Sequence, residues 1–135
     1  MKYNTNLLLL GAINGFVAVA AGAFGAHGLK THISAERLAT WETAAHYQLV
    51  HSVMMVVVAM AMESRSDSRR MSSVGWLFLA GIILFSGSLY ALSLSGFRIL
   101  GIITPFGGVS LLLGWLMLAA CAFKMREDSK SAASG

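Results

Sequence analysis

The sequence predicts an all-α protein, a four-helix transmembrane bundle with a short amphipathic interfacial helix between spans one and two. Composition and spacing predict it. The chain has 135 residues, of which 56% are hydrophobic and only 12% charged, against about 25% charged in an ordinary soluble domain. A hydrocarbon core about 30 Å thick requires about 20 apolar residues per helix, and the apolar residues fall into four such segments. Residues 1–135 are therefore predicted to form a single membrane domain.

The first predicted span covers residues 6–26, which contain no charged side chain. Two interpretations are open for it. Lys2 and the small residues 21–23 have the pattern of a cleaved signal peptide. The length of the segment, and Gly11 and Gly15 at the four-residue spacing of a helix-packing face, favour a retained span.

Residues 35–43 predict the interfacial helix, because their apolar residues recur at helical spacing within a polar segment. Ser34 is suited to cap its N-terminus, and Glu36 complements the helix dipole in the first turn. Trp41 is the expected anchor at the outer membrane interface. A helix that continues directly into the second span is the alternative.

The other spans are predicted at residues 44–62, 71–95 and 105–123. Thr104 and Pro105 mark the start of the last one, because proline in the first helical turn loses no hydrogen bond. Residues 127–135 are polar and are predicted to form a disordered tail.

The basic residues predict the orientation, with N- and C-termini cytoplasmic. Four spans bring the two ends and the middle loop to one side, with seven basic residues: Lys2, Arg65, Arg69, Arg70, Lys124, Arg126 and Lys130. The other side has three: Lys30, Arg37 and Arg98. Cytoplasmic loops carry the excess of Lys and Arg. The net charge of +4 is thus explained by topology, and no nucleic-acid partner is expected.

Small residues recur in the spans and predict close helix packing, since they allow backbones to approach in lipid. The predicted helix-packing glycines are Gly11, Gly15, Gly22, Gly87, Gly107, Gly108 and Gly114.

Polar side chains within the spans are the candidates for function, because each is costly when it faces lipid. The candidate ligand-binding residues are His27, Glu42, His46, Gln48, His51, Ser86, Ser88, Tyr90 and Thr104. Counted along the helices, they lie at similar depth in the outer half of the bundle. Two interpretations follow: a hydrated pocket that opens toward the periplasm, or separate hydrogen bonds between helices.

The second span also raises a metal or haem site as an alternative, because Met54 and Met55 follow His51 and offer soft ligands. His46 and His51 lie about 140° apart around a helix, however, so they do not readily bind one ion together. We therefore predict neither a metal nor a cofactor. The spans contain no nucleophile with a matching base, which predicts a protein that is not an enzyme.

Four motifs together resemble the YgdD/YwdK family of small inner-membrane proteins. They are Gly22-Ala23-Phe24-Gly25-Ala26-His27-Gly28-Leu29, His46-Tyr47-Gln48 followed by His51, Leu84-Phe85-Ser86-Gly87-Ser88-Leu89-Tyr90, and Ile103-Thr104-Pro105-Phe106-Gly107-Gly108 with Gly114-Trp115. The resemblance implies a four-span protein of the bacterial inner membrane and a domain of unknown function, so it supplies no activity.

Two functions remain open at this stage. The first is a non-enzymatic binding or accessory protein whose polar cluster holds a lipid, a small molecule or a membrane partner. The alternative is a conduit for a small solute, proton or metal ion, formed by a homo-oligomer within the lipid bilayer.

Overall fold

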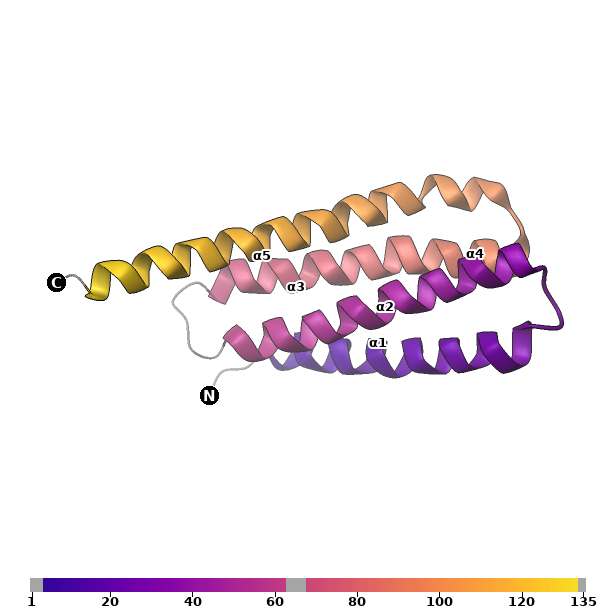
Figure 1. Cartoon of the computed structure of the whole chain (residues 1–135), viewed down its shortest axis with the longest axis horizontal. Helices are drawn as coiled ribbons and strands as arrows, with labels where there is room; N and C mark the ends of the chain where they lie inside the picture. Colours follow the sequence, from indigo (N-terminus) through magenta and orange to yellow (C-terminus); the bar gives the residue numbers. More distant parts are fainter. Residues whose placement is uncertain (1–3, 63–67, 134–135) are drawn as a thin grey trace.

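The computed structural model of the chain describes residues 4–62 and 68–133, and all regular structure within them is helical (Figure 1). The elements are α1 (Thr5–Phe24), η1 (Gly25–Leu29), α2 (Ala35–Ala61), α3 (Ser68–Gly81), η3 (Ile82–Ser86), α4 (Gly87–Ser95), η4 (Arg98–Ile102) and α5 (Thr104–Ala133). The elements η1 and η3 are π-helical turns that continue α1 and join α3 to α4. The predicted all-α bundle is confirmed.

Four helical segments of the described residues are long and apolar enough to cross a membrane: Thr5–Leu29, Ala35–Ala61, Arg69–Ser95 and Arg98–Ala133. Neighbouring segments run in opposite directions, so both termini lie at one end of the bundle, here called the terminal end (Figure 1). The turns before α2 and before η4 lie at the opposite end, here called the loop end. This is the arrangement that four crossings require.

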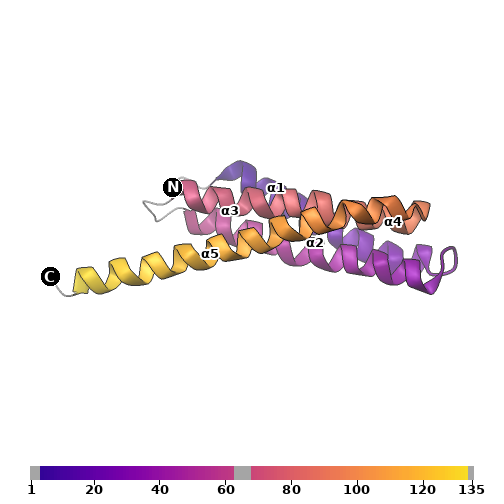
Figure 2. The ribbon, with the colours of Figure 1, turned by 90° about the horizontal axis from the view of Figure 1, so that it is seen from above.

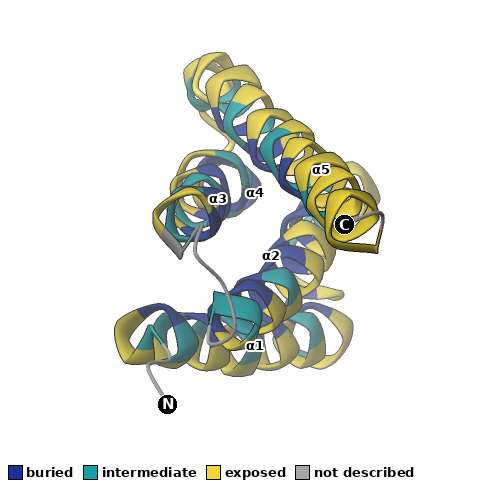
Figure 3. Cartoon of the chain, turned by 90° about the vertical axis from the view of Figure 1, so that its left-hand side faces the viewer, coloured by how far each residue is buried: buried dark blue, intermediate teal, exposed yellow. Residues whose placement is uncertain are grey.

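The outward surface of the spans is apolar. Phe16, Leu112 and Leu116 are 76%, 65% and 67% exposed, and exposed residues cover the outer faces of the helices (Figure 3). A soluble monomer rarely exposes large contiguous apolar patches. The surface of this bundle is therefore suited to lipid.

Helix α2 is the centre of the bundle. It contacts α1 on one side and α3, η3 and α4 on another, whereas α5 packs mainly on α3 and η3. Viewed along the bundle, α1 and α5 lie on opposite sides of α2 (Figure 3). Side chains that leave α2 in different directions therefore reach different neighbours.

The apolar core is packed toward the terminal end. Leu7, Met55, Val58 and Phe78 have no exposed surface and belong to one cluster contributed by α1, α2, α3, η3 and α5. Association of helices in lipid depends on such packing, because lipid tails are as apolar as the side chains.

Helix α2 differs from the prediction at its start. It is continuous from Ala35 to Ala61, so residues 35–43 are its first turns and do not form a separate interfacial helix; the alternative of a helix that continues directly into the second span is the one observed. Ser34 caps it as predicted, accepting the Arg37 amide N–H at 3.3 Å. Trp41 was expected at the interface, but it is 7% exposed and donates to the Ala21 carbonyl at 2.7 Å. A buried indole with a backbone partner ties α2 to α1.

The C-terminal segment also differs, because α5 continues to Ala133 where a disordered tail was predicted from residue 127. Its last turns extend beyond the rest of the bundle in two views (Figures 1 and 2). Of residues 127–133, Glu127, Lys130, Ala132 and Ala133 are good helix formers, and none is Pro or Gly. A polar composition was therefore compatible with a helix here.

At the loop end, the Arg37 side chain of α2 caps the C-terminus of α4. Helix α4 ends with Gly96 in the left-handed conformation, at φ 74°. The Arg37 guanidinium of α2 donates through Nε to the Ser93 carbonyl at 2.6 Å and through Nη2 to the Leu94 carbonyl. These are carbonyls of the last helical turn, which has no intrahelical donors for them. Arg37 therefore fixes α4 against α2.

The predicted packing glycines divide into two groups. A Cβ on Gly107 would lie 2.3 Å from the Phe85 backbone nitrogen, and one on Gly114 would lie 2.7 Å from the Phe78 ring. Gly11 approaches α2 similarly, while Gly15 and Gly108 have ordinary contacts. Gly22 and Gly87 were predicted wrongly for packing within this chain, because a Cβ on either would meet nothing within 4 Å. Spacing identifies small residues, but it does not say which face meets a neighbour.

Candidate functional site

A chain of hydrogen bonds joins three helices near the middle of the bundle. The Tyr90 hydroxyl of α4 donates to Gln48 Oε1 of α2 at 2.8 Å, and Gln48 Nε2 donates to Asn14 Oδ1 of α1 at 3.1 Å. Asn14 Nδ2 then donates to the Leu10 carbonyl at 2.9 Å. Gln48 is only 5% exposed. The amide is buried at a depth where polar groups require partners, and here it has two.

These side chains line a pocket of about 300 Å³ between α1 and the rod formed by η3 and α4, here called the α1–α4 groove. Its lining residues are Asn14, Val17, Gln48, Ile82, Ile83, Ser86, Gly87 and Tyr90. None of them carries a charge. Polar groups thus lie within an apolar groove, the combination that is typical of small-molecule sites.

Ser86 is a polar group of this groove whose hydrogen-bonding capacity is unused. The residue is 1% exposed, and its hydroxyl has no hydrogen-bond partner among the described residues. A helical serine commonly donates to the carbonyl four residues earlier. That carbonyl belongs to Ile82, and it accepts the Gly87 amide N–H in the π-helical turn. Single π turns occur often at functional sites.

Gly87 keeps the groove open. It lies on the groove lining, is exposed, and would gain no neighbour within 4 Å if it carried a Cβ. Any larger side chain there would project into free space at the groove. The residue is therefore relevant to the site through its lack of a side chain.

His51 belongs to a different group, on the side of α2 that faces α3 and α5. The Trp115 indole Nε1–H donates to His51 Nε2 at 3.1 Å, and His51 Nδ1 lies 2.7 Å from the Tyr47 carbonyl. An indole N–H only donates and a carbonyl only accepts. His51 is therefore the neutral tautomer with its proton on Nδ1, and both nitrogens are occupied by protein partners.

Aromatic rings enclose this imidazole. Its ring centroid lies 5.4 Å from that of Phe78, 5.9 Å from that of Tyr47 and 6.1 Å from that of Trp115. A metal ligand needs a free lone pair, and the Nε2 lone pair accepts the indole proton. Within residues 4–62 and 68–133, no three His, Cys, Asp or Glu side chains gather in a way that suits a metal.

The remaining candidates lie apart from both groups. Thr104 of α5 hydrogen-bonds Ser88 of α4 at 2.8 Å between their hydroxyl oxygens, and Ser88 also donates to the Phe85 carbonyl. His27, Glu42 and His46 are exposed. His46 borders a small pocket of about 140 Å³ with Tyr47, Val50 and His51.

The structure therefore does not form the single polar ring that similar depths predicted. Gln48 and His51 lie about 60° apart around the α2 axis. Because α2 is central, that difference directs Gln48 toward α1 and α4 and His51 toward α3 and α5. Equal depth brings residues together only when they face the same neighbour.

Three partners in these groups were absent from the candidates. Asn14 is the polar residue of the groove on α1, and Trp115 and Trp41 supply indole donors to His51 and Ala21. A signal for Asn14 existed in its position, because a single amide in the middle of an apolar span needs a partner. For Trp41 and Trp115 the sequence offered no comparable signal, because tryptophan is also typical of the membrane–water interface.

Residues 21–108 match the family described as Protein of unknown function (DUF423). The chain belongs to this family. It is 47% identical over 118 residues to a UPF0382 membrane protein of Staphylococcus saprophyticus, covering 87% of this chain and 97% of the relative. It is 45% identical over 117 residues to UPF0382 membrane protein YwdK of Bacillus subtilis, covering 87% and 95%. The resemblance to the YgdD/YwdK family is confirmed.

The relatives of this DUF423 chain are named membrane proteins, and the bundle has four membrane-capable helices, so the chain is a membrane protein. No solved structure matches it. The matched region contains Gln48, Ser86, Gly87 and Tyr90 of the α1–α4 groove but not Asn14.

Proposed function

We propose that this DUF423 protein is a non-enzymatic membrane protein that binds an uncharged, lipid-soluble molecule in the α1–α4 groove. The observation that carries the proposal is the unpartnered Ser86 hydroxyl beside the Asn14–Gln48–Tyr90 hydrogen bonds, within an otherwise apolar lining. The ligand expected there has an apolar body and a carbonyl, ester or hydroxyl group that accepts hydrogen bonds.

The depth of the groove supports an uncharged ligand. Gln48 lies four residues, about 6 Å at 1.5 Å per residue, beyond the start of the predicted second span at residue 44. A hydrocarbon core about 30 Å thick therefore includes it. A charged headgroup at this depth would lose its hydration without an opposite charge, because no groove residue is ionised.

The free hydrogen-bonding groups support an acceptor on the ligand. Gln48 and Asn14 each use one amide hydrogen in the bonds described, so each has a second one to donate. The Ser86 hydroxyl supplies a further donor. Three donors are therefore free in the groove, and a ligand carbonyl or ester oxygen would complement them.

The arrangement supports binding over catalysis and over conduction. Amides, one phenol and one hydroxyl line the groove, and none of them is paired with a base that would activate it. The core beside α2 is filled by fully buried Met55, Val58 and Phe78. A conduit would therefore require an oligomer.

We further propose that the protein lies in the bacterial inner membrane with both termini in the cytoplasm. The seven-to-three distribution of basic residues supports the orientation. The relatives in Bacillus and Staphylococcus support the bacterial setting.

The test is photo-crosslinking with a neutral lipid, combined with a substitution that fills the groove. The purified chain would be incubated with a diazirine-bearing dioleoylglycerol, and crosslinked peptides would be located by mass spectrometry. We expect labelling within residues 82–90. Gly87→Leu should fill the groove and reduce this labelling about tenfold, the effect of losing about 1.4 kcal/mol of binding.

Gly22→Leu is the matched control, since its Cβ would also meet nothing within 4 Å but Gly22 does not line the groove. It should label like the parent chain. Folded yield by size-exclusion chromatography should stay equal for both variants. Equal labelling of the two variants, or labelling confined to other helices, would overturn the proposal.

A further inference from the structure

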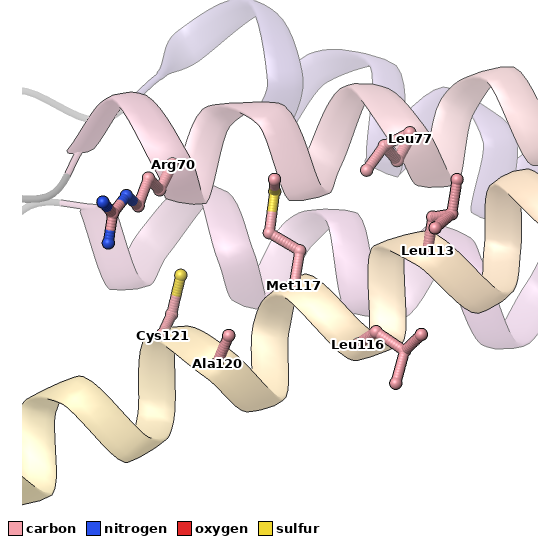
Figure 4. Close-up of a pocket in the computed structure, with 7 residues that line it drawn as sticks. All are labelled: Arg70, Leu77, Leu113, Leu116, Met117, Ala120 and Cys121. Atoms are coloured by element: carbon pink, nitrogen blue, oxygen red, sulfur yellow. The ribbon is translucent and has the colours of Figure 1, made fainter.

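A second groove lies between α3 and α5, toward the terminal end of the bundle (Figure 4). It has a volume of about 480 Å³ and is lined by Arg70, Leu77, Leu113, Leu116, Met117, Ala120 and Cys121. Five of these side chains are apolar and the sixth is the Cys121 thiol. Arg70 lies at the terminal end of the groove (Figure 4). Leu113 and Leu116 are 48% and 67% exposed, so the groove opens to the surrounding lipid.

The position of Arg70 along its span places it at the membrane surface. The span Arg69–Ser95 has 27 residues, about 40 Å at 1.5 Å per residue, which exceeds the hydrocarbon thickness of about 30 Å. Arg70 is the second residue of this span and therefore lies at headgroup depth. Leu77 lies about 10 Å deeper. The groove thus runs from the headgroup region into the hydrocarbon.

Charge at this end favours an anionic headgroup. By sequence, the two ends and the middle loop carry the seven basic residues named above against four carboxylates, Glu63, Asp67, Glu127 and Asp128. A guanidinium matches phosphate oxygens with two parallel hydrogen bonds. Basic pockets between transmembrane helices are known to bind anionic lipid headgroups.

We propose that this α3–α5 groove binds an anionic phospholipid, with its phosphate on the Arg70 guanidinium and one acyl chain along Leu77, Leu116 and Met117. A lipid fits better than a second copy of the chain. A copy aligned in the same membrane would bring a terminal end of the same positive charge against Arg70, and like charges repel. The site is separate from the α1–α4 groove and does not depend on the function proposed for it.

Native mass spectrometry of the full chain tests the headgroup. The protein in detergent would receive equimolar palmitoyl-oleoyl phosphatidylglycerol and phosphatidylcholine, and retained lipids would be counted. We expect phosphatidylglycerol to exceed phosphatidylcholine about fivefold, the contribution of one arginine near the surface. Arg70→Gln should bring the ratio near one. Arg69→Gln, its exposed neighbour outside the groove lining, should preserve the preference.

Arg70→Lys guards against an effect on folding, because it conserves the charge and should retain part of the preference. Equal retention of the two lipids by the parent chain would overturn the proposal. The same holds if Arg70→Gln and Arg69→Gln behave alike.

A second pair of variants tests the acyl chain. Ala120→Phe should fill the groove and lower retention of both lipids, whereas Ala119→Phe alters an exposed residue of α5 that does not line it. If Ala120→Phe leaves phosphatidylglycerol bound, the headgroup is held without the groove and the proposed site is wrong. Inorganic phosphate as a competitor should not displace the lipid from the parent chain. Displacement by phosphate would indicate a free-phosphate site instead.

Discussion

Trp115 of α5 donates its indole N–H to His51 Nε2 of α2 at 3.1 Å, and this bond defines the chemistry that the histidine can perform. With Nδ1 directed at the Tyr47 carbonyl, the imidazole has neither a free lone pair nor a free proton. The residue that the sequence offered as a ligand-binding candidate is thus a structural link between helices. The candidate site lies on the other side of α2, where hydrogen-bonding groups remain unused.

His51→Ala is therefore expected to lower folded yield in detergent, because it removes the acceptor of the Trp115 indole N–H and leaves a cavity where the buried imidazole packs among the aromatic rings. Removal of one buried partner costs about 1–3 kcal/mol. His46→Ala is the control, since His46 is exposed and makes no hydrogen bond within the described residues. Thermal unfolding monitored by circular dichroism would measure both. A His51→Ala protein as stable as His46→Ala would contradict the structural role.

Tyr90→Phe should destabilise the bundle by about 0.6 kcal/mol, the mean value for a hydrogen bond between transmembrane helices. Gln48→Leu should cost about twice that, because Gln48 bonds both Tyr90 and Asn14. Tyr47→Phe serves as the matched control, as no hydrogen bond of its hydroxyl occurs among the described residues. Denaturation in mixed micelles with increasing SDS would give the differences. The hydrogen-bond chain would be refuted by equal stability of the Tyr90→Phe and Tyr47→Phe proteins.

Gly107→Ala and Gly108→Ala form a matched pair of neighbours on α5. The Cβ at position 107 would meet the Phe85 backbone at 2.3 Å, which cannot move without shifting η3, whereas at 108 the nearest atom is a ring carbon of Phe85 at 3.8 Å. We expect Gly107→Ala to destabilise by about 1–3 kcal/mol through overpacking. Gly108→Ala should be neutral or slightly stabilising, because alanine favours helix. Denaturation in mixed micelles with SDS would measure the stability of both variants. Equal stability of the Gly107→Ala and Gly108→Ala proteins would mean that α5 packs differently.

The orientation is testable with a phosphatase fused after Gly135. If both termini are cytoplasmic, the fusion should be inactive, because the enzyme folds productively only after export. A fluorescent-protein fusion at the same position is the complementary control and should be bright. An active phosphatase would reverse the proposed topology.

Gln48 and His51 illustrate what the sequence could not decide. Their residue types alone marked both as costly in lipid, and that inference required no structure. Which neighbour each side chain reaches depends on how α1, α3, α4 and α5 are arranged around α2, and this is a property of packing between residues far apart in the chain. Asn14 carried the same residue-type signal and was overlooked, whereas its pairing with Gln48, 34 positions away, is visible only in the tertiary structure.

The sequence by itself determined the number of spans and the membrane setting, because apolar length and capping are local properties that each segment carries alone. The Ser34 cap and the start of α5 at Thr104 belong to this class. Only the tertiary structure decided that α2 is continuous, that Gly107 packs while Gly87 opens a groove, and that the polar residues form separate groups. Each of those outcomes depends on the direction in which a side chain leaves its helix and on which helix stands there, and no periodicity within one helix contains that information.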